Sequence, residues 1–358
     1  MTPNYNKVHL KFKINRIHYT YDDLMEVAYS FVKEGEDYEQ AIGAFLLDWL
    51  DGNDYINVKT SGSTGQPKII KLKKQSMVNS ALATGDFFNL KPGDKALFCL
   101  PADYVAGKLM IIRAIILGLE LDTVKPTSYP IFDSQHQYDF CAMVPIQLQN
   151  CKTYCNTIKT IIVGGAPVSS KLKKSIINVE SNVYESYGMT ETVSHIALKK
   201  LNNFDSENKN APHFKVLPHI SVSQDDRGCL VVDAPTISEG IVVTNDIIKL
   251  YSETEFEWVG RFDNVINSGG IKLFPEQIEA KLHEAIESRF FIASQPHDIL
   301  GEQLILVLES ELNEVDDSIF NELDKYEIPK VIYAINTFTE TALGKIHRKK
   351  TLEAALLA

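Results

Sequence analysis

Nine residues between two short apolar segments combine hydroxyl groups, glycines and a lysine in a pattern suited to binding phosphate. In order they are Thr60, Ser61, Gly62, Ser63, Thr64, Gly65, Gln66, Pro67 and Lys68. Glycines let backbone amides turn towards an oxyanion, hydroxyls supply further donors, and the lysine adds positive charge. The stretch is not the mononucleotide P-loop, because the required Gly-Lys-Ser/Thr run is missing. Taken alone, it suits a flexible hairpin as well as a loop around nucleotide phosphates.

Further polar motifs follow along the chain. They are Gly-Gly-Ala-Pro at 164–167, Tyr-Glu-Ser-Tyr-Gly-Met-Thr-Glu-Thr at 184–192, Thr-Asn-Asp at 244–246, Gly-Arg-Phe-Asp-Asn at 260–264, Ser-Gly-Gly-Ile-Lys at 268–272 and Gly-Lys at 344–345. The series, in this order, resembles the superfamily of adenylate-forming enzymes, which contains acyl-CoA synthetases, peptide-synthetase adenylation domains and luciferases. The resemblance extends over roughly residues 55 to 350, nearly the whole chain.

This resemblance implies how a nucleotide would be bound. Tyr187 would stack on the adenine, and Asp246 would accept hydrogen bonds from both ribose hydroxyls. The Thr-Gly-Asp that is usual around this acid reads Thr244-Asn245-Asp246 here. The backbone would approach the base closely at positions with little or no side chain, which are Gly164, Gly165, Ala166 and Gly188.

The resemblance also implies which residues are catalytic. Thr190 would donate a hydrogen bond to an α-phosphate oxygen, and Glu191 would be an oxygen ligand of Mg²⁺. Arg261 would contact the ribose or a phosphate. Lys345 would bind the α-phosphate and the substrate carboxylate, where negative charge builds in the transition state. His195, just after this motif, suits either the acyl pocket or a structural role.

The implied reaction has two halves and three small-molecule partners. A carboxylic acid attacks the α-phosphorus of ATP, pyrophosphate leaves, and a thiol then attacks the acyl-AMP. Coenzyme A is the expected thiol, because no attachment motif of a carrier protein is visible. The resemblance implies that a small C-terminal domain rotates near Asp263 between the two halves. Gly269 and Gly270 would then line the passage for the thiol.

Within the superfamily, the chain looks most like the o-succinylbenzoate–CoA ligases of menaquinone biosynthesis. The features that favour this group are the short region before the phosphate-binding stretch and the run from Ser186 to His195. Their substrate keeps a second carboxylate, so one end of the pocket must be cationic or rich in hydroxyls. The alternatives are another acyl- or aryl-CoA ligase, an enzyme that adenylates for a carrier protein, and a catalytically inactive nucleotide-binding relative.

The elements that must position these motifs can be recognised from the spacing of apolar residues. Along the chain, segments with strand spacing alternate with segments of helical length. Apolar runs at 96–100, 140–144 and 160–163 have strand character, and helix-length stretches such as 107–117 and 169–177 follow them. This alternation predicts an α/β fold whose large domain is layered around mainly parallel strands.

The sequence pattern changes near residue 220 to short strand-like segments joined by turns. Segments 221–224 and 229–233 flank Asp225-Asp226-Arg227-Gly228, which predicts a hairpin in a small antiparallel, barrel-like subdomain that closes the large domain. A small, mobile α+β C-terminal domain follows, with a helix expected to begin at Pro275. We therefore predict a large AMP-binding domain over residues 1–261 and a small domain over 262–358, with the hinge near Asp263.

Composition excludes several other classes. The chain has 358 residues, of which 44% are hydrophobic and 23% charged, as is usual for a globular protein. Its formal net charge of −11 argues against a nucleic-acid or anionic-membrane binder. No secretory signal or membrane-spanning run is recognisable. The five cysteines are scattered without the spacing of a zinc site, so we expect reduced thiols and a cytoplasmic location.

Overall fold

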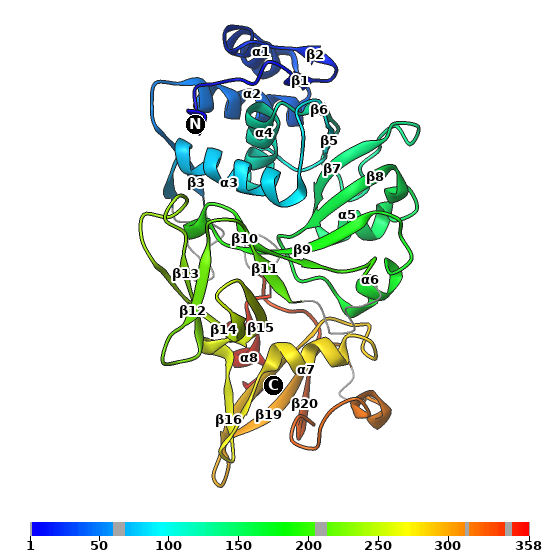
Figure 1. Cartoon of the computed structure of the whole chain (residues 1–358). Helices are drawn as coiled ribbons and strands as arrows, with labels where there is room; N and C mark the ends of the chain where they lie inside the picture. The colour runs from blue at the N-terminus through cyan, green and yellow to red at the C-terminus, as the bar shows by residue number, and fades with distance from the viewer. Residues whose placement is uncertain (1, 60–68, 205–212, 312–314, 341–345, 358) are drawn as a thin grey trace.

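The computed structural model of the chain describes residues 2–59, 69–204, 213–311, 315–340 and 346–357. Within them, the strands form a 13-stranded sheet, a five-stranded sheet and a separate two-stranded ribbon. The large sheet has the order β12-β13-β14-β15-β11-β10-β9-β8-β7-β5-β6-β1-β2. The large sheet and its helices make up the upper part of Figure 1, and the five-stranded sheet lies at the lower end.

The N-terminal region places two helices against the edge of the large sheet. It consists of β1 (Lys13–Ile14), β2 (Ile17–His18), α1 (Tyr21–Glu34) and α2 (Asp37–Leu50). In α2 the apolar residues Ile42, Phe45, Leu46 and Trp49 recur at helical spacing, and all four are buried.

A parallel block forms the centre of the large sheet. Its strands are β5 (Lys95–Phe98), β6 (Glu120–Thr123), β7 (Tyr138–Met143), β8 (Ile158–Val163) and β9 (Asn182–Gly188). Its helices are α3 (Lys74–Phe88), α4 (Val105–Leu117), α5 (Pro145–Cys151) and α6 (Ser170–Ser175). The helix α6 is shorter than the expected 169–177, because Ser169 caps its start and the chain leaves helical geometry at Ile176.

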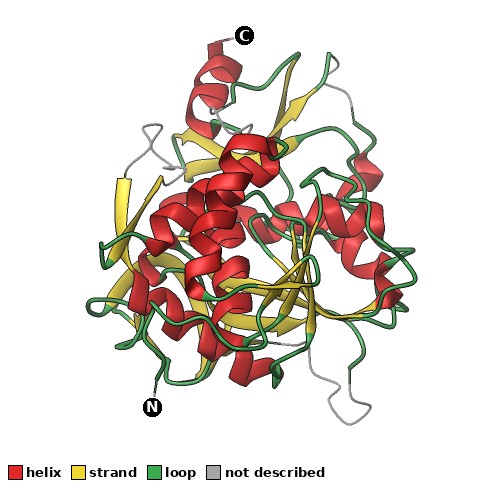
Figure 2. Cartoon of the chain, turned by 90° about the horizontal axis from the view of Figure 1, so that it is seen from above, coloured by secondary structure: helices red, strands yellow, loops and turns green. Residues whose placement is uncertain are grey.

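Alternation along the central strands produces the layered arrangement predicted from the sequence, with helices on both faces of the sheet. In β7, Phe140 belongs to the core formed with α3 and α4, whereas its neighbour Cys141 belongs to the core formed with α5 and α6. Successive side chains of a strand point to opposite faces, so the two helix pairs lie on opposite sides of the sheet. Figure 2 shows the strands between these two groups of helices.

The antiparallel strands continue the same sheet. They are β10 (His195–Lys200), β11 (Phe214–Val216), β12 (Ser221–Gln224), β13 (Cys229–Asp233), β14 (Val242–Ser252) and β15 (Glu255–Arg261). The predicted β12–β13 hairpin is present, with Gly228 at a φ of +78° in its turn. β9 pairs with β8 in parallel and with β10 in antiparallel fashion, so β9 joins the two parts.

A two-stranded ribbon flanks the predicted phosphate-binding stretch. It consists of β3 (Tyr55–Lys59) and β4 (Ile69–Lys73), and Lys59 pairs with Ile69. The two strands coincide with the two short apolar segments that flank this stretch in the sequence. Residues 60–68 between them lie outside the described residues.

The C-terminal unit has its own sheet and its own cores. Its regular elements are η3 (Phe262–Asn264), β16 (Ile266–Ser268), β17 (Ile271–Leu273), α7 (Pro275–Leu282), β18 (Phe290–His297), β19 (Gly301–Glu309), η4 (Asp317–Phe320), β20 (Val331–Ile335) and α8 (Arg348–Leu357). As expected, Pro275 is the first residue of α7. Two clusters of buried apolar side chains lie entirely within this unit. The domain boundary after residue 261 falls between β15 and η3 and stays a prediction.

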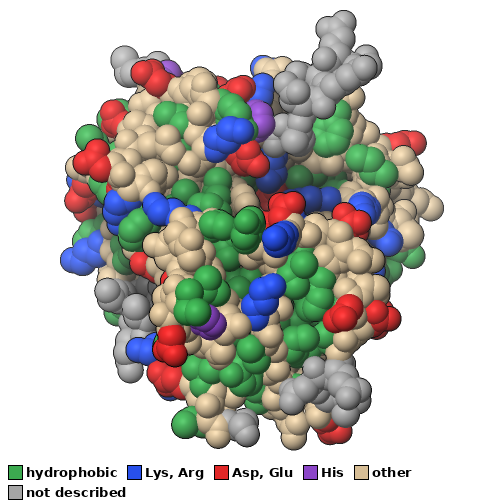
Figure 3. All heavy atoms as spheres, turned by 90° about the horizontal axis from the view of Figure 1, so that it is seen from below, with side chains coloured by type: hydrophobic (Ala, Val, Ile, Leu, Met, Phe, Trp, Pro, Cys, Tyr) green, Lys and Arg blue, Asp and Glu red, His purple; other side chains and the backbone are tan. Residues whose placement is uncertain are grey.

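Polar contacts join the two units in this structure. The Lys174 ammonium of α6 lies 2.6 Å from the Glu284 carboxylate, just beyond α7, and Ser170 donates to the Ala280 carbonyl oxygen at 3.4 Å. Seen from the C-terminal unit, acidic and basic side chains lie interspersed among apolar ones (Figure 3).

The cysteines are buried thiols. All five are free, and four of them share the core beneath α5 and α6, namely Cys99, Cys141, Cys151 and Cys155. The Sγ atoms of Cys99 and Cys141 are 3.8 Å apart. In the described residues, no helix is long and apolar enough to cross a membrane.

Candidate active site

Tyr187 and Asp246 come into contact across the antiparallel strands. The Tyr187 hydroxyl donates to Oδ2 of Asp246 at 2.5 Å, although β10, β11 and β15 lie between β9 and β14 in the sheet order. Adjacent strands are about 4.8 Å apart, so a flat sheet would separate these two strands by about 19 Å. The contact therefore requires the antiparallel strands to curve strongly, which is the barrel-like shape expected from the sequence.

The tyrosine is fixed and neutral. Its ring packs against Phe256 and Phe214, with centroids 5.4 and 5.8 Å away. Burial, followed by the negative charge of Asp246, raises the pKa of Tyr187 well above its ordinary value. The hydroxyl is thus a permanent hydrogen-bond donor, and it orients the carboxylate that would hold the ribose.

Two more motif residues complete a network around this carboxylate. Arg261 lies 3.4 Å from Asp246 and also 3.4 Å from Asp263. Asn245, at the position where the superfamily usually has glycine, donates to Asp263 at 3.2 Å. The predicted ribose acid, the predicted arginine and the predicted hinge residue are thereby brought together.

The glycine-rich turn follows β8 at the carboxyl edge of the parallel strands. A Cβ on Gly164 would lie 2.2 Å from Oγ of Ser186 on the neighbouring strand, so a larger residue here would have to displace the Ser186 side chain. Gly165 has a φ of +82°, which favours glycine. Gly165 and Ala166 are exposed beside β9, where ligands of open α/β sheets usually bind.

A short helical turn presents the next predicted residues. Thr190 and Glu191 lie in η2 (Thr190–Thr192), between β9 and β10. The hydroxyl of Thr192 is fully buried and lies 3.0 Å from the Met189 carbonyl oxygen and 2.9 Å from that of Ser194, so its one proton closes the turn by donation to either oxygen. A Cβ on Gly188 would lie 2.3 Å from the Ser194 carbonyl oxygen, so glycine is needed for this tight return. Glu191 is exposed at the surface of the turn.

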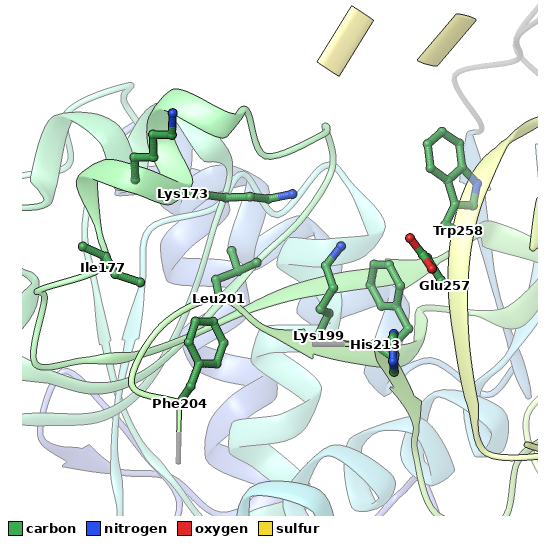
Figure 4. A pocket seen from close by; sticks show the side chains of 10 residues that line it. Lys173, Ile177, Lys199, Leu201, Phe204, His213, Glu257 and Trp258 are labelled. Atoms are coloured by element: carbon green, nitrogen blue, oxygen red, sulfur yellow. The ribbon is translucent and has the colours of Figure 1, made fainter. Parts of the chain in front are cut away.

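A cavity of about 620 Å³ adjoins the Tyr187 network. Its lining residues are Lys173, Lys174, Ile177, Lys199, Leu201, Phe204, His213, Phe214, Glu257 and Trp258. Figure 4 shows Lys173 and Lys199 extending into the same space, with Trp258 across from them. The link to the network is Phe214, which lines the cavity and contacts Tyr187.

Glu185 lies behind this cavity and was missed by the sequence reasoning. Its carboxylate is 2.9 Å from the Lys199 ammonium and 3.3 Å from that of Lys173. Burial favours the neutral acid, but the two lysines outweigh burial and lower the pKa of Glu185. An ionised carboxylate therefore stands on the same strand as Tyr187.

Arg113 is a second residue that the sequence reasoning missed. It lies in the middle of α4, is only 3% exposed, and has no carboxylate partner among the described residues. Its Nε donates to the Thr84 hydroxyl at 3.4 Å, and Nη2 lies 3.5 Å from the Ser194 hydroxyl. Burial lowers the pKa of Arg113 to about 10, so the guanidinium remains charged at neutral pH.

His195 belongs to the same cluster. Nη2 of Arg113 lies 3.3 Å from its Nδ1, and the Thr84 hydroxyl lies 3.3 Å from its Nε2. Because guanidinium can only donate, Nδ1 must accept, and the proton of the neutral ring resides on Nε2. Burial and then the charge of Arg113 hold the pKa of His195 well below its ordinary value. His195 is thus a buried hydrogen-bond partner of Arg113. This contact fits the structural role, which was one of the two roles considered for His195.

Other predicted residues lie apart from this assembly or outside the described residues. Gly269 and Gly270 form the two-residue turn of the β16–β17 hairpin with φ values of +58° and +83°, as a type I′ turn requires. Figure 1 shows β16 extending away from the large sheet. The predicted phosphate-binding residues Thr60, Ser61, Gly62, Ser63, Thr64, Gly65 and Lys68, and the predicted catalytic Lys345, lie outside the described residues.

Comparison with known proteins gives a consistent picture. The family model described as AMP-binding enzyme matches residues 13–236. The chain is 26% identical to the 2-succinylbenzoate–CoA ligase of Listeria monocytogenes, in an alignment that covers 93% of this chain and 77% of the relative.

Two solved structures have similar folds. An acyl-CoA synthetase (AMP-forming)/AMP-acid ligase II-like protein of Dyadobacter fermentans is 35% identical, with a TM-score of 0.60 over 92% of this chain and 97% of that chain. The o-succinylbenzoate CoA synthetase of Bacillus subtilis, solved with its acyl-adenylate intermediate, is 16% identical, with a TM-score of 0.74 over 95% of each chain. At 16% identity, the similarity to the Bacillus subtilis enzyme shows a shared fold.

Proposed function

Because the chain belongs to the family of AMP-binding enzymes, we propose that it is an ATP-dependent carboxylate–CoA ligase that converts o-succinylbenzoate into o-succinylbenzoyl-CoA through an acyl-adenylate. The enzyme class rests on the family and on the motif residues that meet at Asp246. The choice of acid rests on Arg113 and on the names of the curated relatives.

Arg113 is the observation that carries the choice of acid. A buried guanidinium with only neutral partners is costly unless an anion compensates its charge. The groups that it contacts, which are the Thr84 and Ser194 hydroxyls and the His195 ring, are all neutral, so its charge is left for an anion such as a carboxylate. In o-succinylbenzoate one carboxylate is activated and the other is kept, so the retained carboxylate has the charge and geometry that Arg113 would bind.

The residues around Asp246 would act by binding and orientation in the first half-reaction. The Asp246 carboxylate, held by Tyr187, would accept both ribose hydroxyls, and Arg261 would turn from it to the nucleotide. Thr190, on its rigid turn, would donate to the α-phosphate. Lys345 would stabilise the charge that develops as the substrate carboxylate attacks phosphorus and pyrophosphate leaves.

Magnesium would assist this step. When bound, Mg²⁺ neutralises phosphate charge; it keeps several waters and needs only one or two protein carboxylates. Glu191 fits this requirement, because it is a single exposed carboxylate beside Thr190. Coenzyme A is the proposed acceptor in the second half-reaction, with Gly269 and Gly270 lining its path after rotation at Asp263.

The first experiment supplies the purified protein with ATP, Mg²⁺, coenzyme A and o-succinylbenzoate, beside a panel of aryl and fatty acids. Pyrophosphate and CoA esters are followed by mass spectrometry. A CoA ester from o-succinylbenzoate alone is the expected result. Esters only from other acids would keep the enzyme class and discard this acid, and absence of pyrophosphate with every acid would favour an inactive nucleotide-binding relative.

Replacing Arg113 with methionine is expected to lower kcat/KM for o-succinylbenzoate by roughly 100-fold, because hydrogen bonds to a buried charge are worth about 1.5–3 kcal/mol each. The comparison substrate is 4-oxo-4-phenylbutanoate, which lacks the ring carboxylate and should lose little. Thermal unfolding should not become easier, since an apolar side chain of similar length suits a buried position.

The matched control is Arg113→Lys, which keeps the charge but not the planar fork. We expect an intermediate kcat/KM for o-succinylbenzoate from this variant. If both variants lowered the rates with the two acids equally, Arg113 would not select the second carboxylate.

A further inference from the structure

A bulge in β14 carries Asp246. Between two consecutive pairs of the β13–β14 ladder, one residue of β13 stands opposite three of β14, which are Thr244, Asn245 and Asp246. On its other side, β14 keeps Asp246 paired with Arg261 of β15. Bulges are frequent beside active sites, where they redirect a side chain. The shape of this bulge therefore sets where the Asp246 carboxylate lies.

Arg227 reaches this bulge from the turn between β12 and β13. Its Nη1 donates to Oδ1 of Asn245 at 2.8 Å, and its Nη2 donates to the Thr244 carbonyl oxygen at 3.0 Å. One guanidinium thus holds both of the residues that directly precede Asp246. Two bonds from a planar fork fix direction as well as distance, so this contact restricts the bulge to one shape.

The turn that carries Arg227 is itself well anchored. The Asp225 carboxylate accepts from the amides of Arg227 and Cys229, each at 2.9 Å, and from Nε of Arg227 at 2.8 Å. Gly228 closes the turn with a φ of +78°, a conformation that favours glycine. The Arg227 side chain is therefore fixed at its base by Asp225 and at its tip by the bulge.

The Asn245 side chain extends this contact to the start of the C-terminal unit. Its Oδ1 faces Arg227, because guanidinium can only donate, and its Nδ2 faces the Asp263 carboxylate, which can only accept. Glycine, which is usual at this position in the superfamily, could make neither bond. Asn245 therefore gives this chain a link between Arg227 and Asp263.

Exposure decides what Arg227 can contribute. Its side chain is 38% exposed, and exposed ion pairs generally add little to global stability. Thr244 and Asp246, in contrast, are buried, so Arg227 covers the outer side of a buried part of β14. The expected effect of Arg227 is therefore on the placement of Asp246 and not on the stability of the fold.

We propose that Arg227 is a positioning residue for Asp246, acting through the two residues that precede it. The proposal rests on the proposed function, in which the Asp246 carboxylate accepts both ribose hydroxyls of ATP. Tyr187 holds this carboxylate from the front, at 2.5 Å, and Arg227 holds the backbone behind it. Loss of Arg227 removes one of these constraints and weakens recognition of the ribose hydroxyls, while contacts with the base and the phosphates persist.

The test compares ATP with 2′,3′-dideoxy-ATP in Arg227→Met. Pyrophosphate exchange with o-succinylbenzoate gives kcat/KM for each nucleotide, and their ratio measures the preference for ribose hydroxyls. A hydrogen bond to a charged group corresponds to roughly 10- to 100-fold in affinity, so Arg227→Met should lower the preference for ATP at least about fivefold. The loss should fall on KM for ATP, because binding is weakened. Thermal unfolding should be unchanged.

Three further variants and a binding measurement make this test specific. Lys215→Met removes another exposed cation of the antiparallel strands, paired with Glu255 at 3.3 Å, and should leave the preference unchanged. Arg227→Lys keeps the charge without the fork and should restore part of the preference. Asn245→Gly should lose less than Arg227→Met, because Arg227 still reaches the Thr244 carbonyl oxygen. Calorimetric titration with Mg²⁺ and each nucleotide, without any acid, should show the same change in the ratio of Kd values.

Two results would overturn the proposal. One is the full wild-type preference for ATP in Arg227→Met, and the other is an equal loss with ATP and its dideoxy analogue. Adding Arg227→Met to Asp246→Asn should cause no further loss of preference, and a further loss would show that Arg227 acts by another route. If the wild-type protein exchanged no pyrophosphate with any acid, the proposed function would fail, and the calorimetric ratio would still decide the role of Arg227.

Discussion

Replacing Lys345 with alanine is expected to slow acyl-adenylate formation by roughly 100- to 1,000-fold, the usual loss when one preorganised group that stabilises transition-state charge is removed. Negative charge on the α-phosphate rises as the carboxylate attacks, and the ammonium is proposed to neutralise it. Coenzyme A attacks a carbonyl that is already activated, so transfer from supplied acyl-AMP should continue. Pyrophosphate exchange and thioester formation measure the two steps separately.

The matched control for this variant is Lys349→Ala. Lys349 is an exposed lysine of α8, only four positions further along the chain. Its loss removes the same charge from the same basic stretch, and we expect both half-reactions to be unchanged. If Lys345→Ala slowed both half-reactions equally, the role assigned to Lys345 in adenylate formation would be wrong.

Replacing Asp263 with proline should have the reverse effect. Proline fixes φ near −65°, so the turn of η3 would resist the change of backbone angles that rotation between the units demands. The proposed rotation would also break the contact between Lys174 and Glu284. Pyrophosphate release should persist within a few-fold, while formation of the CoA ester should fall by roughly 100-fold or more, as gating steps can limit turnover.

Asp263→Ala distinguishes the backbone from the side chain. It removes the contacts with Asn245 and Arg261 but leaves the main chain free. We expect this variant to form CoA ester at a rate close to that of the wild type. Normal CoA ester formation by Asp263→Pro would place the hinge elsewhere.

The layered part of the fold was predictable because its signals are local. Apolar runs of strand length alternate with helical stretches around β5, β7 and β8, and Pro275 marks the start of α7. The meeting of Tyr187 and Asp246 was implied only by the resemblance. The curvature that brings them together depends on pairings between distant strands, which no local pattern encodes.

The grouping of residues around Arg113, here called the Arg113 cluster, could not be predicted from the sequence. Its four members come from α3, α4, the start of β10 and the residue just before it, so no spacing rule connects them: Thr84, Arg113, His195 and Ser194. One signal was nevertheless present. Residues 109–117 read Leu-Met-Ile-Ile-Arg-Ala-Ile-Ile-Leu, and a helix that is apolar all round is buried. A single charge within such an apolar stretch marks a buried ion that needs a partner or a ligand.

The four buried cysteines beneath α5 and α6 can be used to measure how often this part of the core opens. Burial raises the pKa of the Cys151 thiol to about 11 and that of Cys155 to about 12, and only the thiolate reacts quickly. A thiol-specific reagent can therefore label these cysteines only when this core opens. Its labelling rate records how often that happens, as amide exchange does. Ligands that bind at the carboxyl edge of β8 and β9 would slow the labelling, so occupancy could be followed without any enzymatic turnover.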